Sequence, residues 1–203
     1  MGVYFEKSEV IVTRRTFICD AMLGRLAVWL RLWGYDCAFD AHIADDDLIR
    51  RAGQEGRVLL TRDRALLSRR AARALPCFFV AQDGFREQLA AVAEKFGLDA
   101  SGLGTRCSRC NTPLEETSRE AVRTVVPYFV GCTADRFARC PSCGRVYWRA
   151  THHRGMEEES RAILAKCASS TPSLSGRDPS GRGDDNPVPN DDPRSGSGRR
   201  ATD

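Results

Sequence analysis

The chain has 203 residues, 42% of them apolar and 29% charged, which is ordinary for a globular protein and excludes a disordered or fibrous one. This length suffices for one domain with an appendage but not for two full-sized α/β domains. No apolar run reaches the roughly 18–20 residues of a membrane span, and residues 1–13 lack the basic and apolar regions of a secretory signal. We therefore expect a cytoplasmic protein with no membrane segment.

The net charge of +4 is unevenly distributed along the chain. Residues 16–104 contain 12 basic and 12 acidic residues, whereas residues 105–154 contain 9 arginines and only 4 acids. A basic segment beside a neutral one favours an anionic partner, and nucleic acid fits best. A solvated basic face that binds no ligand is the alternative.

Residues 16–104 alternate short apolar runs with amphipathic stretches. The runs predict strands at 16–19, 35–39, 57–61 and 76–81. Apolar residues at helical spacing predict helices at 23–33, 45–55, 64–74 and 85–96. Because continuous apolar strands alternate with helices, we expect an α/β fold whose parallel sheet is covered by helices on both faces.

Four aspartates follow the predicted strands. Asp20, Asp63 and Asp83 each lie at or just past the end of a strand, and Asp45 opens the helix after another. Right-handed crossovers would bring all four to one edge of the sheet. Carboxylates gathered there repel one another unless a cation compensates, and Mg²⁺ or Mn²⁺ suits an all-oxygen site that hydrolyses phosphodiesters. Alternatively, Asp45 or one of its two neighbours is only a helix cap and Asp83 only a turn residue. Asp20 and Asp63 are harder to explain in this way, since each directly follows a buried strand.

The same residues carry a family resemblance. Residues 17–36 closely resemble the opening motif of the Mut-seven C-terminal RNase domain family, a branch of the PIN-like nucleases. Residues 59–64 match its second signature, and Asp45-x-x-Leu48 with Ala52 matches the helix between them. The resemblance covers residues 16–154. Val28 departs from it, since the family more often has a basic residue there.

The resemblance implies a PIN-like fold with a Mg²⁺-dependent ribonuclease centre. Asp20, Asp45 and Asp63 would be metal ligands, Asp83 the fourth acid, and Thr61 the hydroxyl residue that assists such sites. Arg25, Arg62 and Arg64 would grip backbone phosphates, for which the arginine fork is suited, or would be solvated surface residues. PIN-like domains often pair, so a homodimer is also possible.

Cysteines mark a second predicted site. Cys107 and Cys110 form one C-x₂-C pair and Cys140 and Cys143 another, with 29 residues between the pairs. In an intracellular chain this spacing predicts a closed Cys₄ zinc site of structural type, with a disulfide or redox pair as the alternative. The family carries a comparable zinc ribbon at its C-terminal end.

The ribbon also contains candidate RNA contacts. Arg139, Arg145 and Arg149 surround Tyr147 and Trp148, a mixture of cations and aromatic rings that suits RNA. Alternatively, the two aromatic side chains simply cover the zinc core.

We therefore predict four segments: an N-terminal extension at 1–15, a PIN-like RNase domain at 16–104, a zinc ribbon at 105–154, and a short helix with a disordered tail at 155–203. From residue 171 onward the chain is mostly Pro, Gly, Ser, Asp and Arg, which cannot bury enough apolar surface to fold. The predicted function is a metal-dependent ribonuclease whose acidic edge cuts RNA while the zinc ribbon helps to hold it. A non-cleaving RNA-binding module with a PIN-like fold is the alternative. A redox or zinc-storage protein would explain the cysteines but not the carboxylates.

Overall fold

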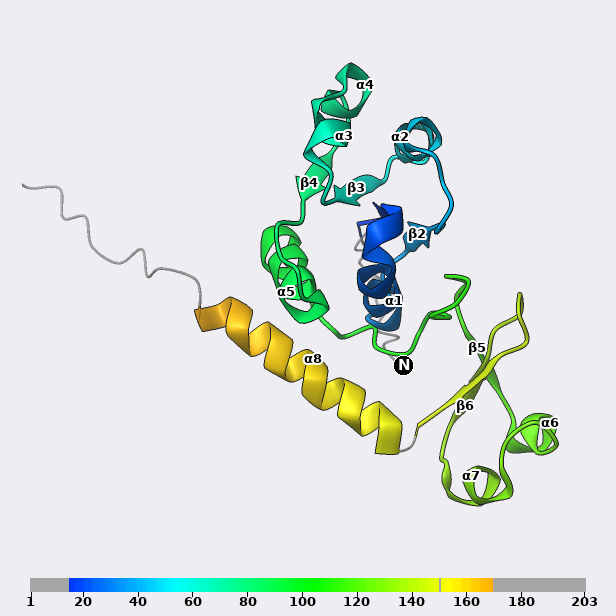
Figure 1. The fold of residues 1–203 in the computed structure, drawn as a ribbon. Coiled ribbons are helices and arrows are strands. Elements are labelled where there is room, and N and C mark those ends of the chain that lie inside the picture. The colour runs from blue at the N-terminus through cyan, green and yellow to red at the C-terminus, as the bar shows by residue number, and fades with distance from the viewer. Residues whose placement is uncertain (1–14, 150, 170–203) are drawn as a thin grey trace, which may run out of the picture. The chain divides into compact units, whose positions relative to one another are not determined.

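The computed structural model describes residues 15–149 and 151–169 (Figure 1). The chain divides into two compact units, Met1–Thr171 and Pro172–Asp203, and every described residue belongs to the first. The predicted tail and residues 1–14 of the predicted extension lie outside the described residues. Within the described part, no helix combines the length and the apolar character that crossing a membrane requires.

A four-stranded parallel sheet lies at the centre of the N-terminal part. Its strands are β1 (Phe17–Cys19), β2 (Cys37–Phe39), β3 (Val58–Thr61) and β4 (Cys77–Phe79), in the order β2-β1-β3-β4. Every neighbouring pair is parallel. The strands form where short apolar runs are buried on both sides, as in β1 and β3. The predicted α/β fold with a parallel sheet is confirmed.

Helices cover both faces of this sheet. They are η1 (Ala21–Leu23), α1 (Gly24–Leu32), α2 (Asp45–Gln54), α3 (Arg64–Ser68), α4 (Arg70–Arg73) and α5 (Phe85–Phe96). Side chains alternate across a strand, so Phe17 and Cys19 pack with α1 and α5, whereas Ile18 packs with α2 and α3. The helix expected at 64–74 is two helices, because the backbone of Arg69 is extended, with ψ 138°.

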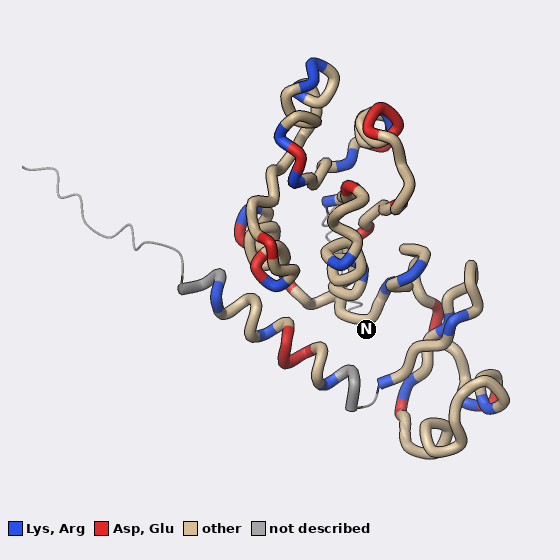
Figure 2. Tube along the Cα trace, in the orientation of Figure 1, with Lys and Arg blue, Asp and Glu red and all other residues tan. Residues whose placement is uncertain are grey.

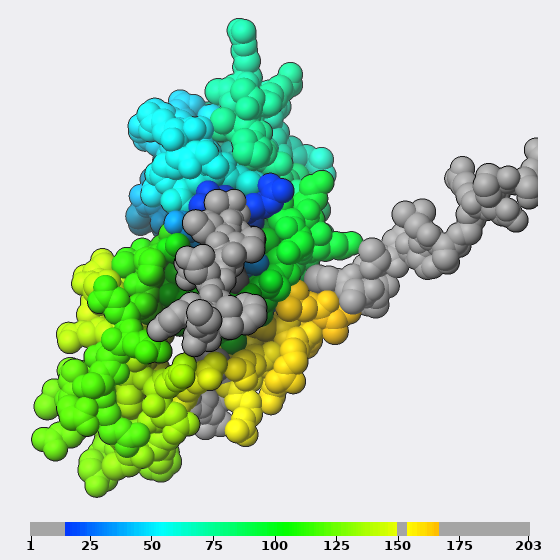
Figure 3. Space-filling view, turned by 180° about the vertical axis from the view of Figure 1, so that it is seen from behind, coloured from blue at the N-terminus to red at the C-terminus, as the bar shows by residue number. Residues whose placement is uncertain are grey.

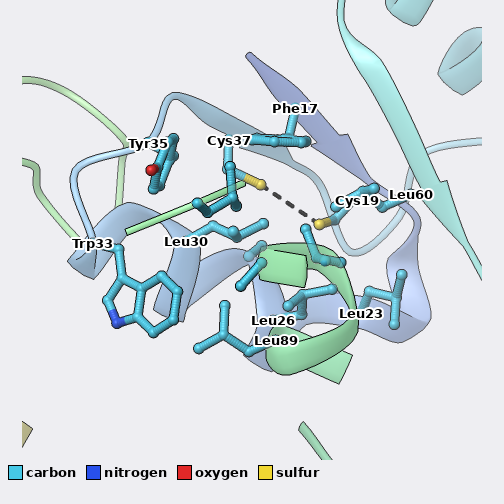
Figure 4. Packing of buried hydrophobic residues seen from close by; sticks show 14 of the residues in the cluster. Phe17, Cys19, Leu23, Leu26, Leu30, Trp33, Tyr35, Cys37, Leu60 and Leu89 are labelled. Carbon is cyan, nitrogen blue, oxygen red and sulfur yellow. Dashed lines mark hydrogen bonds between the residues drawn. The ribbon is translucent and has the colours of Figure 1, made fainter. Parts of the chain in front are cut away.

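The larger core cluster lies between β1, α1 and α5 (Figure 4). Cys19 and Cys37 are buried there with their Sγ atoms 3.5 Å apart. Burial raises the pKa of the Cys19 thiol well above its ordinary value, so this cysteine packs as a small, neutral apolar residue.

Where a short helix is expected near the C-terminal end, the structure has α8 (Thr151–Ser169), which packs along α5 (Figures 1 and 3). Ile163 is buried in the same core as α1 and α5. The indole Nε1–H of Trp33 donates to Ser160 Oγ at 2.8 Å. The helix is therefore part of the core that covers the parallel sheet and not a separate appendage.

A second, antiparallel sheet follows the first. It contains β5 (Glu115–Thr117), β6 (Phe137–Arg139) and β7 (Val146–Trp148), in that order. Two short helices, α6 (Arg119–Val122) and α7 (Tyr128–Thr133), lie between β5 and β6. Val122, Val126, Ala134 and Phe137 form a small core of their own.

Candidate functional site

Asp20 and Thr61 meet at the carboxyl edge of the parallel sheet. Asp20 directly follows β1 and Thr61 ends the neighbouring strand β3, and the register pairs Cys19 with Leu60. The Thr61 hydroxyl donates to Asp20 Oδ2 at 2.6 Å. Both side chains are buried, Asp20 at 7% exposure and Thr61 at 0%. The bond therefore fixes the carboxylate of Asp20 in one orientation.

The same hydroxyl reaches Asp63. The backbone N–H of Asp63 donates to Thr61 Oγ1 at 2.9 Å, while Asp63 Oδ1 accepts from the N–H of Ala65 at 2.7 Å as the N-cap of α3. Thr61 thus links Asp20 to the backbone of Asp63. Asp63 is therefore also a helix cap, which the sequence analysis did not anticipate, and the cap occupies only one of its two carboxylate oxygens.

The other two acids are held by arginines. Asp45, the first residue of α2, accepts from Arg69 at 2.6 Å, and Arg69 also donates to Asp46 at 2.8 Å. Asp83, which follows β4, pairs with Arg62. Its side chain is 93% exposed. Figure 2 shows the acidic start of α2 and the arginines of α3 and α4 that surround this edge.

The carboxylates are therefore near the same edge but not gathered around one point. In the part of the chain that the structure describes, only the four ribbon cysteines place three or more metal-binding atoms within 4.8 Å of one another. Asp45 and Asp83 instead turn toward arginines, because neighbouring carboxylates repel each other and a cation relieves that repulsion.

Asp45 and Asp83 pair with arginines, whereas Asp63 and Asp20 form no ion pair with any described residue. Asp20 is distinguished by its burial, because its side chain is the most buried of the four. A buried charge is costly unless a counter-charge or several hydrogen bonds compensate it. The donor set at this edge, a buried carboxylate with further carboxylates within a few residues, suits a hard divalent cation.

One further oxygen was not identified from the sequence. Gln82 Oε1 lies between β4 and Asp83 and is the one buried side-chain polar atom without a hydrogen-bond partner in the described residues. Amide oxygens also bind Mg²⁺ and Ca²⁺. A Gln in a short loop gives no distinguishing signal in the sequence.

The three arginines expected to grip phosphates lie around the sheet. Arg25 stands over the ring of Phe85 at 3.9 Å from its centroid, and Arg64 over the ring of Phe79 at 4.1 Å. These cation–π contacts hold the guanidinium planes while leaving their N–H edges available. Arg62 is engaged with Asp83.

The four ribbon cysteines lie on two matching turns, which we call the first knuckle (residues 107–110) and the second knuckle (residues 140–143). The N–H groups of Asn111 and Gly144, each directly after a C-x₂-C pair, donate at 2.9 Å to Cys107 and Cys140 O respectively. Both residues have left-handed backbones, with φ 68° and 71°, which Asn and Gly tolerate best. Sγ atoms from opposite knuckles approach to 3.3 Å (Cys110 and Cys140) and 3.6 Å (Cys107 and Cys143).

The chemistry of this set fits tetrahedral Zn²⁺. A hydrogen bond from Thr112 contributes most to lowering the pKa of Cys110 to about 5, whereas burial raises that of Cys140 to about 11. Tyr147 Oη lies 3.1 Å from Cys107 Sγ. Tyr147 therefore lies against the cysteine cluster, whereas the Trp148 side chain is 37% exposed.

The first knuckle is fastened to the parallel sheet by residues that the sequence analysis did not single out. Arg31 of α1 is 5% exposed and donates to Cys37 O at 2.8 Å, Arg109 O at 2.8 Å and Ser108 O at 3.2 Å. Asn111 Oδ1 accepts from the N–H of Cys37 at 3.1 Å. A buried arginine inside an otherwise apolar helix pattern is the signal that was available.

The arginines expected to bind RNA on the ribbon do not share one face. Arg139 pairs with Val146 and lies on the side of the small core, and Trp148 is on this side too. Alternation along β7 places Arg145 and Arg149 on the opposite side with Tyr147. The register therefore places Arg145, Tyr147 and Arg149 on one side of the ribbon sheet and Arg139 on the other.

Residues 15–160 match the family model described as Mut7-C RNAse domain. The chain belongs to this family. The match runs from β1 through both knuckles into α8, so the Mut7-C RNAse domain includes the parallel sheet, the ribbon and the first half of the last helix. No curated protein and no solved structure matches the chain. The resemblance noted from the sequence motifs is confirmed, and it indicates a nuclease-type function.

Proposed function

We propose that this Mut7-C RNAse domain is a metal-dependent ribonuclease that hydrolyses RNA phosphodiester bonds at the carboxyl edge of its parallel sheet. The observation that carries the proposal is the buried carboxylate of Asp20, which has no cationic partner in the described residues and is oriented by the hydroxyl of Thr61. Membership of an RNase domain family supports the same reaction.

The acids at this edge would hold Mg²⁺ or Mn²⁺. Asp20, Asp45 and Asp63 are the proposed ligands and Asp83 the fourth acid. When bound, such an ion supplies a Lewis acid and a more acidic water for phosphodiester hydrolysis.

Asp45 and Asp83 can join this site without a large energetic cost. Arg69 and Asp45 are each 43% exposed, and the Asp83 side chain is 93% exposed. Exposed ion pairs contribute only about 0–1 kcal/mol each, so they can be exchanged for a stronger cation. Arg62 and Arg69, once released, would be free to bind phosphate groups.

The remaining residues would position the substrate. Arg25 and Arg64, held over aromatic rings, and Arg62 would contact backbone phosphates. Thr61 would keep Asp20 in place during the reaction. The four cysteines would bind a structural Zn²⁺, and the ribbon would assist RNA binding, with Arg145 and Arg149 better placed than Arg139 because they share a face with Tyr147.

The test is cleavage of single-stranded and structured RNAs with and without Mn²⁺, comparing Asp20→Asn and Asp63→Asn with Asp47→Asn. Asp47 lies on the same helix as Asp45 but pairs outward with Arg50, so its variant is the matched control. We expect cleavage that requires Mn²⁺, is lost in the first two variants and is kept in the third.

RNA binding without turnover in any metal would support the alternative, a non-cleaving RNA-binding module. Equal cleavage by wild type and Asp20→Asn would refute the proposed site. The cytoplasmic location and the pairing of two copies, both expected from the sequence, stay predictions.

A further inference from the structure

Two hollows adjoin on the surface where the loop at residues 100–105 meets α8 and the ribbon sheet. One has a volume of about 310 Å³ and lies beside α8, with Ser160, Arg161 and Leu164 in its wall; we call it the helix hollow. The other has a volume of about 340 Å³ and lies over the ribbon sheet, with Arg136 and Tyr147 in its wall; we call it the sheet hollow. Each is near the lower end of the range for small-ligand sites, roughly 300 Å³.

The hollows share one wall. Ser101, Leu103 and Arg149 line both of them. Arg149 directly follows β7 and is exposed. Its backbone N–H donates to Arg136 O at 3.3 Å, but within the described ranges its guanidinium forms no hydrogen bond or ion pair. A cation with five N–H donors therefore stands at the junction of two similar cavities.

The walls combine apolar surface with positive charge. Leu103 lies between the hollows, Leu164 in the first and the ring of Tyr147 in the second. The Tyr147 hydroxyl accepts from the N–H of Ser108 at 3.2 Å, which holds the ring in place. Three arginines line the hollows against two glutamates, Glu116 and Glu157, and the Arg136–Glu116 pair is exposed at 3.9 Å.

We propose that the two hollows bind two consecutive nucleotides of single-stranded RNA, with the phosphate that joins them on Arg149. One base stacks on the apolar wall of each hollow, and the guanidinium of Arg149 donates hydrogen bonds to two oxygens of the phosphate. The choice of RNA rests on the proposed ribonuclease function. The site lies on the ribbon and α8, apart from the acids after the parallel strands, so it holds a part of the RNA that is not being cut.

The test is binding of a fluorescently labelled single-stranded RNA of roughly ten nucleotides, a length within the usual range of single-strand sites, measured by anisotropy in EDTA. The variants are Arg149→Ala and Ser101→Glu, which places a negative charge on the shared wall. Ser101 is exposed, so the fold should tolerate this change. Arg123→Ala is the matched control, because it removes the same charge from the ribbon at a position that lines neither hollow.

We expect Arg149→Ala and Ser101→Glu each to weaken binding about tenfold, and Arg123→Ala to weaken it less than twofold. Arg149→Ala should also lower the slope of log affinity against log salt by about one. Wild-type affinity in both hollow variants, or no RNA binding by the wild type, would overturn the proposal. So would competition by polyglutamate as effective as that by unlabelled RNA, since it would show a site for acidic chains without bases.

These results separate the two proposals. If the hollow variants lose binding while no metal supports cleavage, the RNA site stands and the ribonuclease proposal fails. If Asp20→Asn abolishes cleavage while the hollow variants bind normally, the ribonuclease stands and this site fails.

Discussion

Replacing Thr61 by valine removes the hydroxyl that joins Asp20 to Asp63 while nearly preserving the shape of the side chain. Thr61 is fully buried, donates to Asp20 Oδ2 at 2.6 Å and accepts from the N–H of Asp63 at 2.9 Å. A hydrogen bond to a charged group contributes about 1.5–3 kcal/mol and a neutral one about 0.5–1.5 kcal/mol. We therefore expect Thr61→Val to lower the free energy of unfolding by about 2–4 kcal/mol, measured by urea denaturation.

Thr61→Ser is the matched control, because it keeps the hydroxyl and loses only a methyl group, which costs about 1 kcal/mol. The two variants should also differ in function. Replacing a residue that orients a metal ligand typically lowers metal affinity about 10–100-fold. Thr61→Val should therefore raise the Mn²⁺ concentration needed for half-maximal cleavage by at least about tenfold. If the valine variant is as stable as the serine variant and needs no more Mn²⁺, the hydroxyl does not orient Asp20.

Two further predictions concern the contact between the first knuckle and the parallel sheet. Arg31→Met removes three hydrogen bonds to main-chain oxygens and should destabilise the protein by about 3 kcal/mol in denaturant titrations, allowing for incomplete additivity, whereas the exposed Arg50→Met should change stability little. Burial opposes ionisation of Asp36, but hydrogen bonds from Arg57 and Asn111 outweigh it and lower its pKa. The lowered pKa stabilises the fold above the unfolded value of about 3.9 and is lost as the pH falls through the folded value. Wild type should thus be more stable than Asp36→Asn at neutral pH, and the gap should close below about pH 4; a gap that is constant from pH 7 to pH 3 would contradict this reasoning.

The sequence predicted the parallel sheet well because its strands are short apolar runs, and the two central strands, β1 and β3, are buried on both sides. It predicted the cysteine cluster for a different reason, since C-x₂-C spacing alone restricts the geometry of the thiols. The contacts of Asp45 and Asp83 could not be predicted, because they depend on Arg69 and Arg62, which are distant in sequence and among many exposed arginines.

The ribbon was predicted less completely. Its two short helices carry no clear periodicity, and the separation of Arg139 from Arg149 depends on the register of β6 with β7. Arg31 was overlooked because a single arginine in an amphipathic helix usually faces solvent. Its burial follows from carbonyl groups more than seventy residues away along the chain.

The hydrogen bond between Asn111 and Cys37 has a consequence for the outer edge of the parallel sheet. β2 is an outer strand of the parallel sheet, and such strands offer unpaired amides to other chains. The side chain of Asn111 accepts a hydrogen bond from the backbone N–H of Cys37, and Arg31 donates one to the backbone oxygen of the same residue. A fragment ending before the first knuckle would expose this strand, and also the core surface that α8 covers, so we expect it to aggregate although all four strands of the parallel sheet are present.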